Sequence, residues 1–196
     1  MKTILITGAT AGFGEAAARK FVGGGWRAIG TGRRGERLKA LQEELGDAFL
    51  PLEIDMRDFS AVASMAKLSP PWDGIDLLLN NAGLAPPTDP LSETDWERIE
   101  TVIDTNITGL VALTRALLPK LIERKGQIIN LSSVAASYPY KGGAVYAGTK
   151  AFVRQFSLDL RSDLAGTGVR VTSVEPGMGV PPGVTKEGEE GEDEDD

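Results

Sequence analysis

Short apolar runs alternate with longer helical patterns along most of the chain, and this alternation constrains the fold more than any other feature. Several of the runs, such as Ile4-Leu5-Ile6 and Leu77-Leu78-Leu79, are uninterrupted, as strands covered on both faces are. Strands that alternate with helices form βαβ units with right-handed crossovers. The pattern therefore predicts an α/β fold, a doubly wound parallel sheet with helices on both faces. The six expected strands are residues 2–7, 27–31, 49–54, 76–79, 127–131 and 168–175, and the expected helices are residues 13–24, 35–45, 60–66, 92–125 (with or without a break) and 144–164.

Two local signals refine this pattern near the fourth helix. Ser92 and Asp95 have the spacing of a capping box, which predicts a helix that starts there. The segment Ala85–Pro90 is rich in proline, so we expect a loop over the carboxyl edge of the sheet.

The chain has no Cys and no His, and this absence excludes much chemistry. Ser-His-Asp and Cys-His catalysis are impossible, and so are disulfides and metal sites built on thiolate or imidazole. We expect no metal site. Proton transfer must use carboxylates, Lys, Tyr or water.

The net charge of −7 belongs to one end of the chain. Residues 186–196 hold eight acids and one base, so residues 1–185 carry equal numbers of acidic and basic side chains. We therefore expect one domain over residues 1–185, a disordered acidic tail over 186–196, and no nucleic-acid partner. There is neither a signal peptide pattern nor an apolar span of 18 residues, so we expect a cytoplasmic protein without a membrane partner.

The first expected strand runs into a glycine-rich turn, Thr7-Gly8-Ala9-Thr10-Ala11-Gly12-Phe13-Gly14, which opens an Ala-rich helix. Glycines allow a tight turn and close approach of the backbone to phosphate, and the helix N-terminus attracts a pyrophosphate. The turn thus favours a Rossmann-type dinucleotide site. The alternative is a glycine-rich turn without a ligand.

Arg33 and Arg34 follow the second expected strand, where a dinucleotide fold that prefers NAD places an acidic residue. Guanidinium groups bind phosphate through paired N–H donors. The missing acid and the two arginines favour NADP over NAD. The alternative is two solvated arginines at a helix start.

Two further strand ends are candidates for the same site. Asp55 and Met56 follow the third strand, where they could flank an adenine ring, or form a helix-initiating turn together with Asp58. The fourth strand ends in Asn80-Asn81-Ala82-Gly83, which suits either the approach of a cofactor or an ordinary turn.

Tyr146 and Lys150 are four residues apart in a helical pattern and therefore share one helix face, and Ser133 follows the fifth strand. A nearby ammonium stabilises a phenolate, by about 4 kcal/mol at about 4 Å and an effective dielectric of about 20. Such a pair could exchange a proton with a carbonyl or alcohol oxygen near neutral pH. The alternative is a surface face of an amphipathic helix.

Taken together, these motifs resemble the classical short-chain dehydrogenase/reductase family, in the family's order over residues 1 to 178. The resemblance is greatest to its NADP-dependent 3-hydroxy acid dehydrogenases, which include serine and L-allo-threonine dehydrogenases. The motifs that carry the resemblance are Thr7–Glu15, Gly32-Arg33-Arg34, Asn80–Gly83, Asp95-Trp96-Glu97, Ile103–Gly109, Ser133, Tyr146-x-x-x-Lys150, Thr149–Ser157 and Pro176-Gly177.

The resemblance implies roles for individual residues. Tyr146 would be the general acid/base, Lys150 would assist it and hold the nicotinamide ribose, and Ser133 would bind the substrate oxygen. Asn106 would hold a water that links Lys150 to solvent. The cofactor-binding residues would be Gly8, Thr10, Gly12, Phe13, Gly14, Arg33, Arg34, Asp55, Met56, Asn81, Ala82, Gly83, Tyr146, Lys150, Pro176 and Gly177.

The implied activity is reversible NADP-dependent oxidation of a small-molecule secondary alcohol, a 3-hydroxy acid such as serine, allo-threonine or 3-hydroxypropionate. The alternatives are reduction of another carbonyl, such as a 3-oxoacyl thioester, and cofactor binding without turnover. The family also implies a dimer or tetramer. Its pattern continues beyond Pro176-Gly177, so we expect a C-terminally truncated member without the usual seventh strand.

Overall fold

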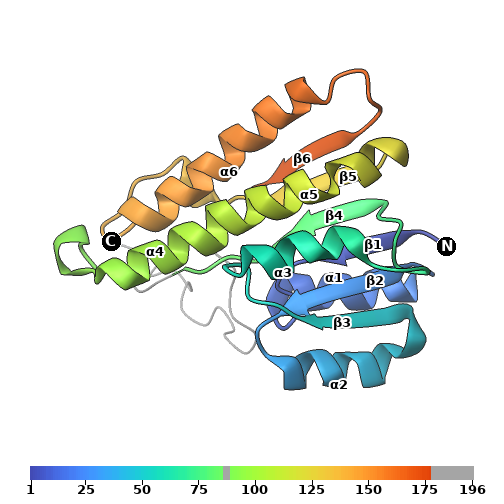
Figure 1. Cartoon of the computed structure of the whole chain (residues 1–196). Coiled ribbons are helices and arrows are strands. Elements are labelled where there is room, and N and C mark those ends of the chain that lie inside the picture. The colour runs from blue at the N-terminus through green and yellow to red at the C-terminus, as the bar shows by residue number, and fades with distance from the viewer. Residues whose placement is uncertain (86–88, 178–196) are drawn as a thin grey trace, which may run out of the picture.

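A computed structural model describes residues 1–85 and 89–177 of the chain. Within these residues, six parallel strands form one sheet in the order β3-β2-β1-β4-β5-β6 (Figure 1). The strands are β1 (Thr3–Ile6), β2 (Arg27–Gly32), β3 (Phe49–Glu53), β4 (Leu77–Asn80), β5 (Gln127–Leu131) and β6 (Arg170–Val174). The predicted doubly wound sheet is confirmed. The predicted acidic tail, the domain end at residue 185 and residues 86–88 of the predicted loop lie outside the described residues.

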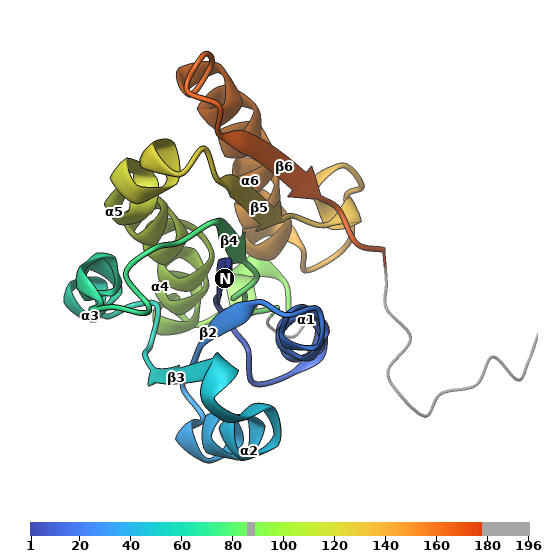
Figure 2. The same ribbon diagram turned by 90° about the vertical axis from the view of Figure 1, so that its right-hand side faces the viewer.

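Helices cover both faces of the sheet (Figure 2). On one face α1 and α2 pack against side chains such as Ile4 and Leu77. On the other face α3, α5 and α6 pack against side chains such as Leu5 and Leu78. Neighbouring residues of one strand point to opposite faces, so covering both faces requires uninterrupted apolar strands. The helices are α1 (Gly12–Gly23), α2 (Gly35–Leu45), α3 (Phe59–Ser64), α4 (Trp96–Ile103), α5 (Gly109–Glu123) and α6 (Ala144–Asp163).

The region predicted as a helix over residues 92–125, with or without a break, begins at Trp96 and contains a break. A π-helical turn, η4 (Asp104–Thr108), separates α4 from α5. The predicted capping box is wrong, because α4 begins at Trp96 and Asp95 makes no side-chain capping bond. Ser92 instead lies in the short 3₁₀ turn η3 (Leu91–Glu93), and the extended backbone at Thr94 separates that turn from the helix. Asp58, by contrast, caps α3 by accepting a hydrogen bond from the Ala61 N–H.

The order of the strands determines where a ligand can bind. The chain moves outward from β1 through β2 to β3, and then crosses to β4 on the other side of β1. The loops after β1 and β4 diverge at this reversal, which leaves a crevice at the carboxyl edge of the sheet. None of the described helices combines the length and the apolar character that crossing a membrane requires.

Candidate active site

The turn after β1 is shaped by glycines that cannot be replaced without strain. Gly8 and Gly12 have φ of 71° and 57°, in the left-handed region that favours glycine. A side chain on Gly14 would collide with the Gly8 carbonyl oxygen. The first turn of α1 follows directly, and its N-cap residue, Ala11, makes no side-chain capping bond. The N–H groups of this turn therefore remain available to an anion at the positive end of the helix dipole.

Asn81 holds this turn against the end of β4. Its side-chain Nδ2 donates to the carbonyl oxygens of Thr7 (2.9 Å) and Gly8 (3.1 Å). In return, the Thr7 hydroxyl accepts hydrogen bonds from the backbone N–H groups of Asn81 (3.0 Å) and Ala82 (2.9 Å). The two loops that flank the crevice are therefore fixed to each other by four hydrogen bonds.

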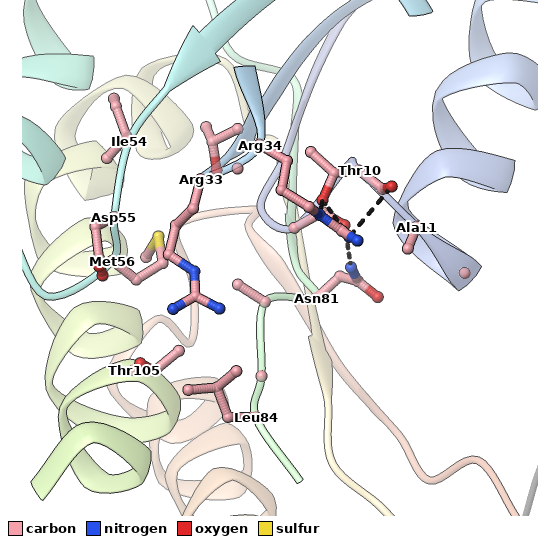
Figure 3. A pocket seen from close by; sticks show the side chains of 16 residues that line it. Thr10, Ala11, Arg33, Arg34, Ile54, Asp55, Met56, Asn81, Leu84 and Thr105 are labelled. Carbon is pink, nitrogen blue, oxygen red and sulfur yellow. Dashed lines mark hydrogen bonds between the residues drawn. The ribbon is translucent and has the colours of Figure 1, made fainter. Parts of the chain in front are cut away.

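A hollow of about 350 Å³ opens beside these loops (Figure 3). It is lined by the carboxyl ends of β1, β2, β3 and β4 and by the π-helical turn. The lining residues are Gly8, Thr10, Ala11, Gly12, Thr31, Gly32, Arg33, Arg34, Ile54, Asp55, Met56, Asn81, Ala82, Gly83, Leu84 and Thr105.

Arg33 and Arg34 behave differently in this hollow. The Arg34 guanidinium donates to the Thr10 hydroxyl from Nη2 (2.7 Å) and Nε (3.2 Å), so it is anchored to the glycine-rich turn. Arg33 extends into the hollow (Figure 3) and makes no hydrogen bond or ion pair with any residue that the structure describes. One guanidinium is thus held in place and the other remains free to bind an anion.

Asp55 is the one carboxylate that lines this hollow, and it is neutralised by a neighbour. Arg57 forms an ion pair with it at 2.8 Å, and this contact lowers the pKa of the Asp55 carboxyl. Met56 lies beside Asp55, and Gly109 brings α5 close to its backbone, since a side chain at Gly109 would strike the Met56 carbonyl oxygen. The net charge of the hollow is therefore positive, as a phosphate ligand requires.

Ser133, Tyr146 and Lys150 meet in a second hollow, of about 220 Å³. It shares Asn81 and Gly83 with the first hollow, so the two adjoin along the same edge of the sheet. Its lining residues are Phe13, Asn81, Gly83, Ala85, Leu131, Ser132, Ser133, Tyr146, Lys150, Pro176 and Gly177. Residues far apart in the sequence, such as Asn81 and Tyr146, are brought together by the parallel strands.

Lys150 is fixed at both ends by the end of β5. Its ammonium donates to the Leu131 carbonyl oxygen (2.9 Å), and its own carbonyl oxygen accepts from the Ser132 hydroxyl (2.8 Å). The ammonium lies 5.8 Å from the centre of the Tyr146 ring. The residue is only 6% exposed, and this burial lowers the pKa of the Lys150 side chain to about 8.

Ser132 and Ser133 are both in the lining, but only one hydroxyl hydrogen remains available. Ser132 is buried and uses its hydrogen on the Lys150 carbonyl. The Ser133 oxygen accepts from the Ala135 N–H (3.1 Å), and its hydrogen has no acceptor among the described residues. This difference supports the prediction that Ser133 is the residue that contacts substrate.

Asn106 lies in the π-helical turn, behind the lining rather than in it. Its Nδ2 donates to the Thr149 hydroxyl (3.0 Å) and to the Leu84 carbonyl oxygen (3.1 Å), and its Oδ1 accepts from the Leu84 N–H (2.8 Å). Both amide hydrogens are therefore used within the protein. The implied water at Asn106 stays a prediction.

Of the predicted site residues, all but Gly14 and Asn106 line one of the two hollows. Gly14 allows α1 to approach the Gly8 carbonyl oxygen, and Asn106 makes hydrogen bonds to Leu84 and Thr149 behind the lining. The lining residues that sequence reasoning left out are Ala11, Thr31, Gly32, Ile54, Leu84, Ala85, Thr105, Leu131 and Ser132. Most of them stand at the carboxyl ends of strands, and that position could have identified them.

The chain is similar to proteins of known family. The model of the family described as short chain dehydrogenase matches residues 2–192. Serine 3-dehydrogenase of Rhizobium radiobacter is 61% identical over 177 residues, which are 90% of this chain and 71% of that protein. The NADP-dependent 3-hydroxy acid dehydrogenase YdfG of Salmonella typhi is 55% identical, over 89% of this chain and 71% of that protein. A solved structure, the closed form of serine dehydrogenase complexed with NADP⁺, is 54% identical with a TM-score of 0.86, and covers 89% of this chain and 71% of its own.

Proposed function

The chain belongs to the short-chain dehydrogenase family, and on this premise we propose that it reversibly oxidises a small 3-hydroxy acid with NADP. One observation carries the proposal. Ser133, Tyr146 and Lys150 share a hollow that adjoins a second, positively charged hollow containing Arg33 and Arg34. The names of the relatives, which specify serine or 3-hydroxy acids and NADP, support the substrate class and the cofactor.

The residues present fit a nicotinamide dinucleotide that carries a 2′-phosphate. The strain-free glycines Gly8 and Gly12 and the start of α1 suit a pyrophosphate, and the free guanidinium of Arg33 suits the additional phosphate. Asp55 and Met56 form the wall that would face the adenine, and Lys150 would hold the nicotinamide ribose. When bound, this cofactor accepts or supplies the hydride.

The proton is moved by the side chains of the second hollow. In the direction of oxidation, the Tyr146 phenolate accepts the hydroxyl proton of the substrate, while the Ser133 hydroxyl donates a hydrogen bond to the same oxygen. The buried Lys150 ammonium lies 5.8 Å from the centre of the Tyr146 ring, so its positive charge attracts the oxygen that carries the negative charge during the transfer. Reduction runs the same proton transfer backwards.

The test measures absorbance at 340 nm with the purified chain and NADP, against serine, allo-threonine and 3-hydroxypropionate. A second arm offers NADPH with an acetoacetyl thioester. We expect turnover with at least one hydroxy acid, and a fall of about 10²- to 10⁴-fold in Tyr146→Phe, which removes a single hydroxyl. Tyr138→Phe, an exposed tyrosine outside both hollows, is the matched control.

Three outcomes contradict the proposal in different ways. Turnover of the thioester alone would assign a carbonyl reductase. Binding of NADPH without turnover of any substrate would assign a cofactor-binding protein. Full activity in Tyr146→Phe would refute the assigned general acid/base. The family also leads us to expect a dimer or tetramer, which light scattering on the purified chain would measure.

A further inference from the structure

Thr149 lies between two members of the proposed catalytic set and makes one hydrogen bond to each. Its hydroxyl donates to the Tyr146 carbonyl oxygen (2.7 Å) and accepts from Asn106 Nδ2 (3.0 Å). The residue is 2% exposed, so water cannot easily replace either partner. Removing one partner of a buried hydrogen bond leaves the other polar group without a partner, and this costs more stability than removing both partners.

Through Thr149, the amide of Asn106 joins three separate segments. The same amide bonds to both backbone groups of Leu84, in the loop after β4. Asn106 itself belongs to the π-helical turn, and Thr149 belongs to α6. A π-helical turn inserts an additional residue into a helix and occurs frequently at functional sites. Thr149 is the partner from α6.

The Asn106 amide that Thr149 holds in this way lies near the Lys150 ammonium. A side chain on Gly83 would place its first carbon 3.2 Å from Lys150 Nζ and 3.5 Å from Asn106 Oδ1. The ammonium and the amide oxygen therefore approach the same small space above Gly83. A movement of the π-helical turn would change the polar surroundings of the ammonium directly.

We propose that Thr149 is a positioning residue for proton transfer: its hydroxyl fixes the Asn106 amide against the turn of α6 that carries Tyr146 and Lys150. The inference rests on the proposed function. A threonine that bonds back to a carbonyl of its own helix is common and can be purely structural. The test therefore needs a readout that a loss of stability alone would leave unchanged.

The chain offers a closely matched control. Thr114 is also buried in a helix (1% exposed), donates to the Leu110 carbonyl oxygen of its own helix (2.7 Å), and accepts from a buried asparagine, Asn80 (3.0 Å). It lines neither hollow. Thr114→Val and Thr149→Val therefore remove the same chemical group from equivalent surroundings, one beside the active site and one within the core.

Activity provides the first readout. In Thr149→Val we expect kcat to fall about tenfold with both KM values within about twofold of wild type, because orientation is lost and binding is kept. The solvent deuterium isotope effect on kcat should rise, since proton transfer becomes slower relative to the other steps. Thr149→Ser keeps the hydroxyl and should restore both quantities. Thr114→Val should lower the thermal midpoint without raising the isotope effect.

The second readout does not depend on activity. In the cofactor-free protein, NMR should show slow solvent exchange for the Asn106 side-chain amide in wild type and Thr149→Ser, and faster exchange in Thr149→Val. If Thr149→Val does not fold, Thr149→Ala removes the same hydroxyl with less disturbance of the backbone, and the same changes are expected.

The outcomes separate this inference from the proposed function. A folded Thr149→Val with wild-type kcat and isotope effect overturns the inference, while an inactive Tyr146→Phe beside it keeps the proposed function. An inactive wild type refutes the proposed function and, with it, the catalytic role of Thr149. Unchanged exchange of the Asn106 amide in Thr149→Val overturns the contact itself, whatever the activity.

Discussion

Replacing Lys150 with methionine should remove activity and, in the absence of cofactor, change how stability depends on pH. Burial lowers the pKa of the Lys150 side chain from 10.5 to about 8. At about 1.4 kcal/mol for each pH unit, this difference corresponds to about 3 kcal/mol of unfolding free energy. The folded state has the lower pKa, so between pH 8 and 10.5 the unfolded chain binds more protons at this group than the folded one. Stability contributed by this group therefore rises with pH across that window.

The sign of the effect is unusual for a charged residue. Below pH 8 the ammonium is charged in both states, and the folded protein bears the whole cost of its burial, about 3 kcal/mol. Methionine is similar in length and has no charge. Lys150→Met therefore does not bear the cost of burying an ammonium at low pH, and it gains no stability when that group would lose its proton at high pH. The lost hydrogen bond to the Leu131 carbonyl reduces the gain by about 1–3 kcal/mol at every pH.

Urea unfolding of both proteins without cofactor, at pH 7 and pH 10, measures the difference. We expect the stability of wild type relative to Lys150→Met to improve by most of 3 kcal/mol between the two pH values. Other groups that titrate in this range contribute to both proteins and cancel in the comparison. Parallel dependence on pH in the two proteins would refute the reasoning, because it would mean that the folded state does not disfavour the ammonium.

Three further predictions concern the cofactor, the space above Gly83 and the tail. Arg33→Ala should weaken NADPH binding about 10- to 100-fold, since a charge-assisted hydrogen bond contributes about 1.5–3 kcal/mol, and should leave NADH binding unchanged; fluorescence titration of both cofactors measures this, and an equal loss for the two would contradict it. Gly83→Ala places a carbon 3.2 Å from Lys150 Nζ, so kcat should fall while the thermal midpoint stays within a few degrees; wild-type kcat would show that the ammonium can move without consequence. Deletion of residues 186–196 should leave the thermal midpoint nearly unchanged, because eight like charges repel one another, and a large decrease in calorimetry would show that they dock on the domain.

The sheet could be predicted because its signal is local and strong. A run such as Leu77-Leu78-Leu79 is buried completely only in a sheet that is covered on both faces. Six expected strands separated by helices are compatible with few sheet topologies. The gathering of Ser133, Tyr146 and Lys150 followed from their places after β5 and along α6. Their individual roles stay predictions until the substitutions are made.

The contacts that orient these residues could not be predicted in the same way. The capping box at Ser92 and Asp95 failed because a spacing does not say whether the backbone between its two ends is helical. The π-helical turn has no signature in composition, and it depends on bonds from Asn106 to segments 22 and 43 residues away. The hydrogen bond from Arg34 to Thr10 likewise depends on the distance between the start of α1 and the start of α2.

The strand order also has a consequence for the growing polypeptide on the ribosome. Once residues 1–53 have emerged, β1, β2 and β3 can pair, but β1 then forms an open edge whose partner, β4, begins only at residue 77. An exposed apolar edge strand invites pairing with other chains. The crevice between the loops after β1 and β4 does not exist until β4 has paired with β1. A dinucleotide therefore cannot bind to residues 1–53 alone and protect them from aggregation. Slower translation between β3 and β4 should therefore increase aggregation. Because β4 in turn waits for β5, which begins at residue 127, slower translation over residues 81–126 should increase it as well.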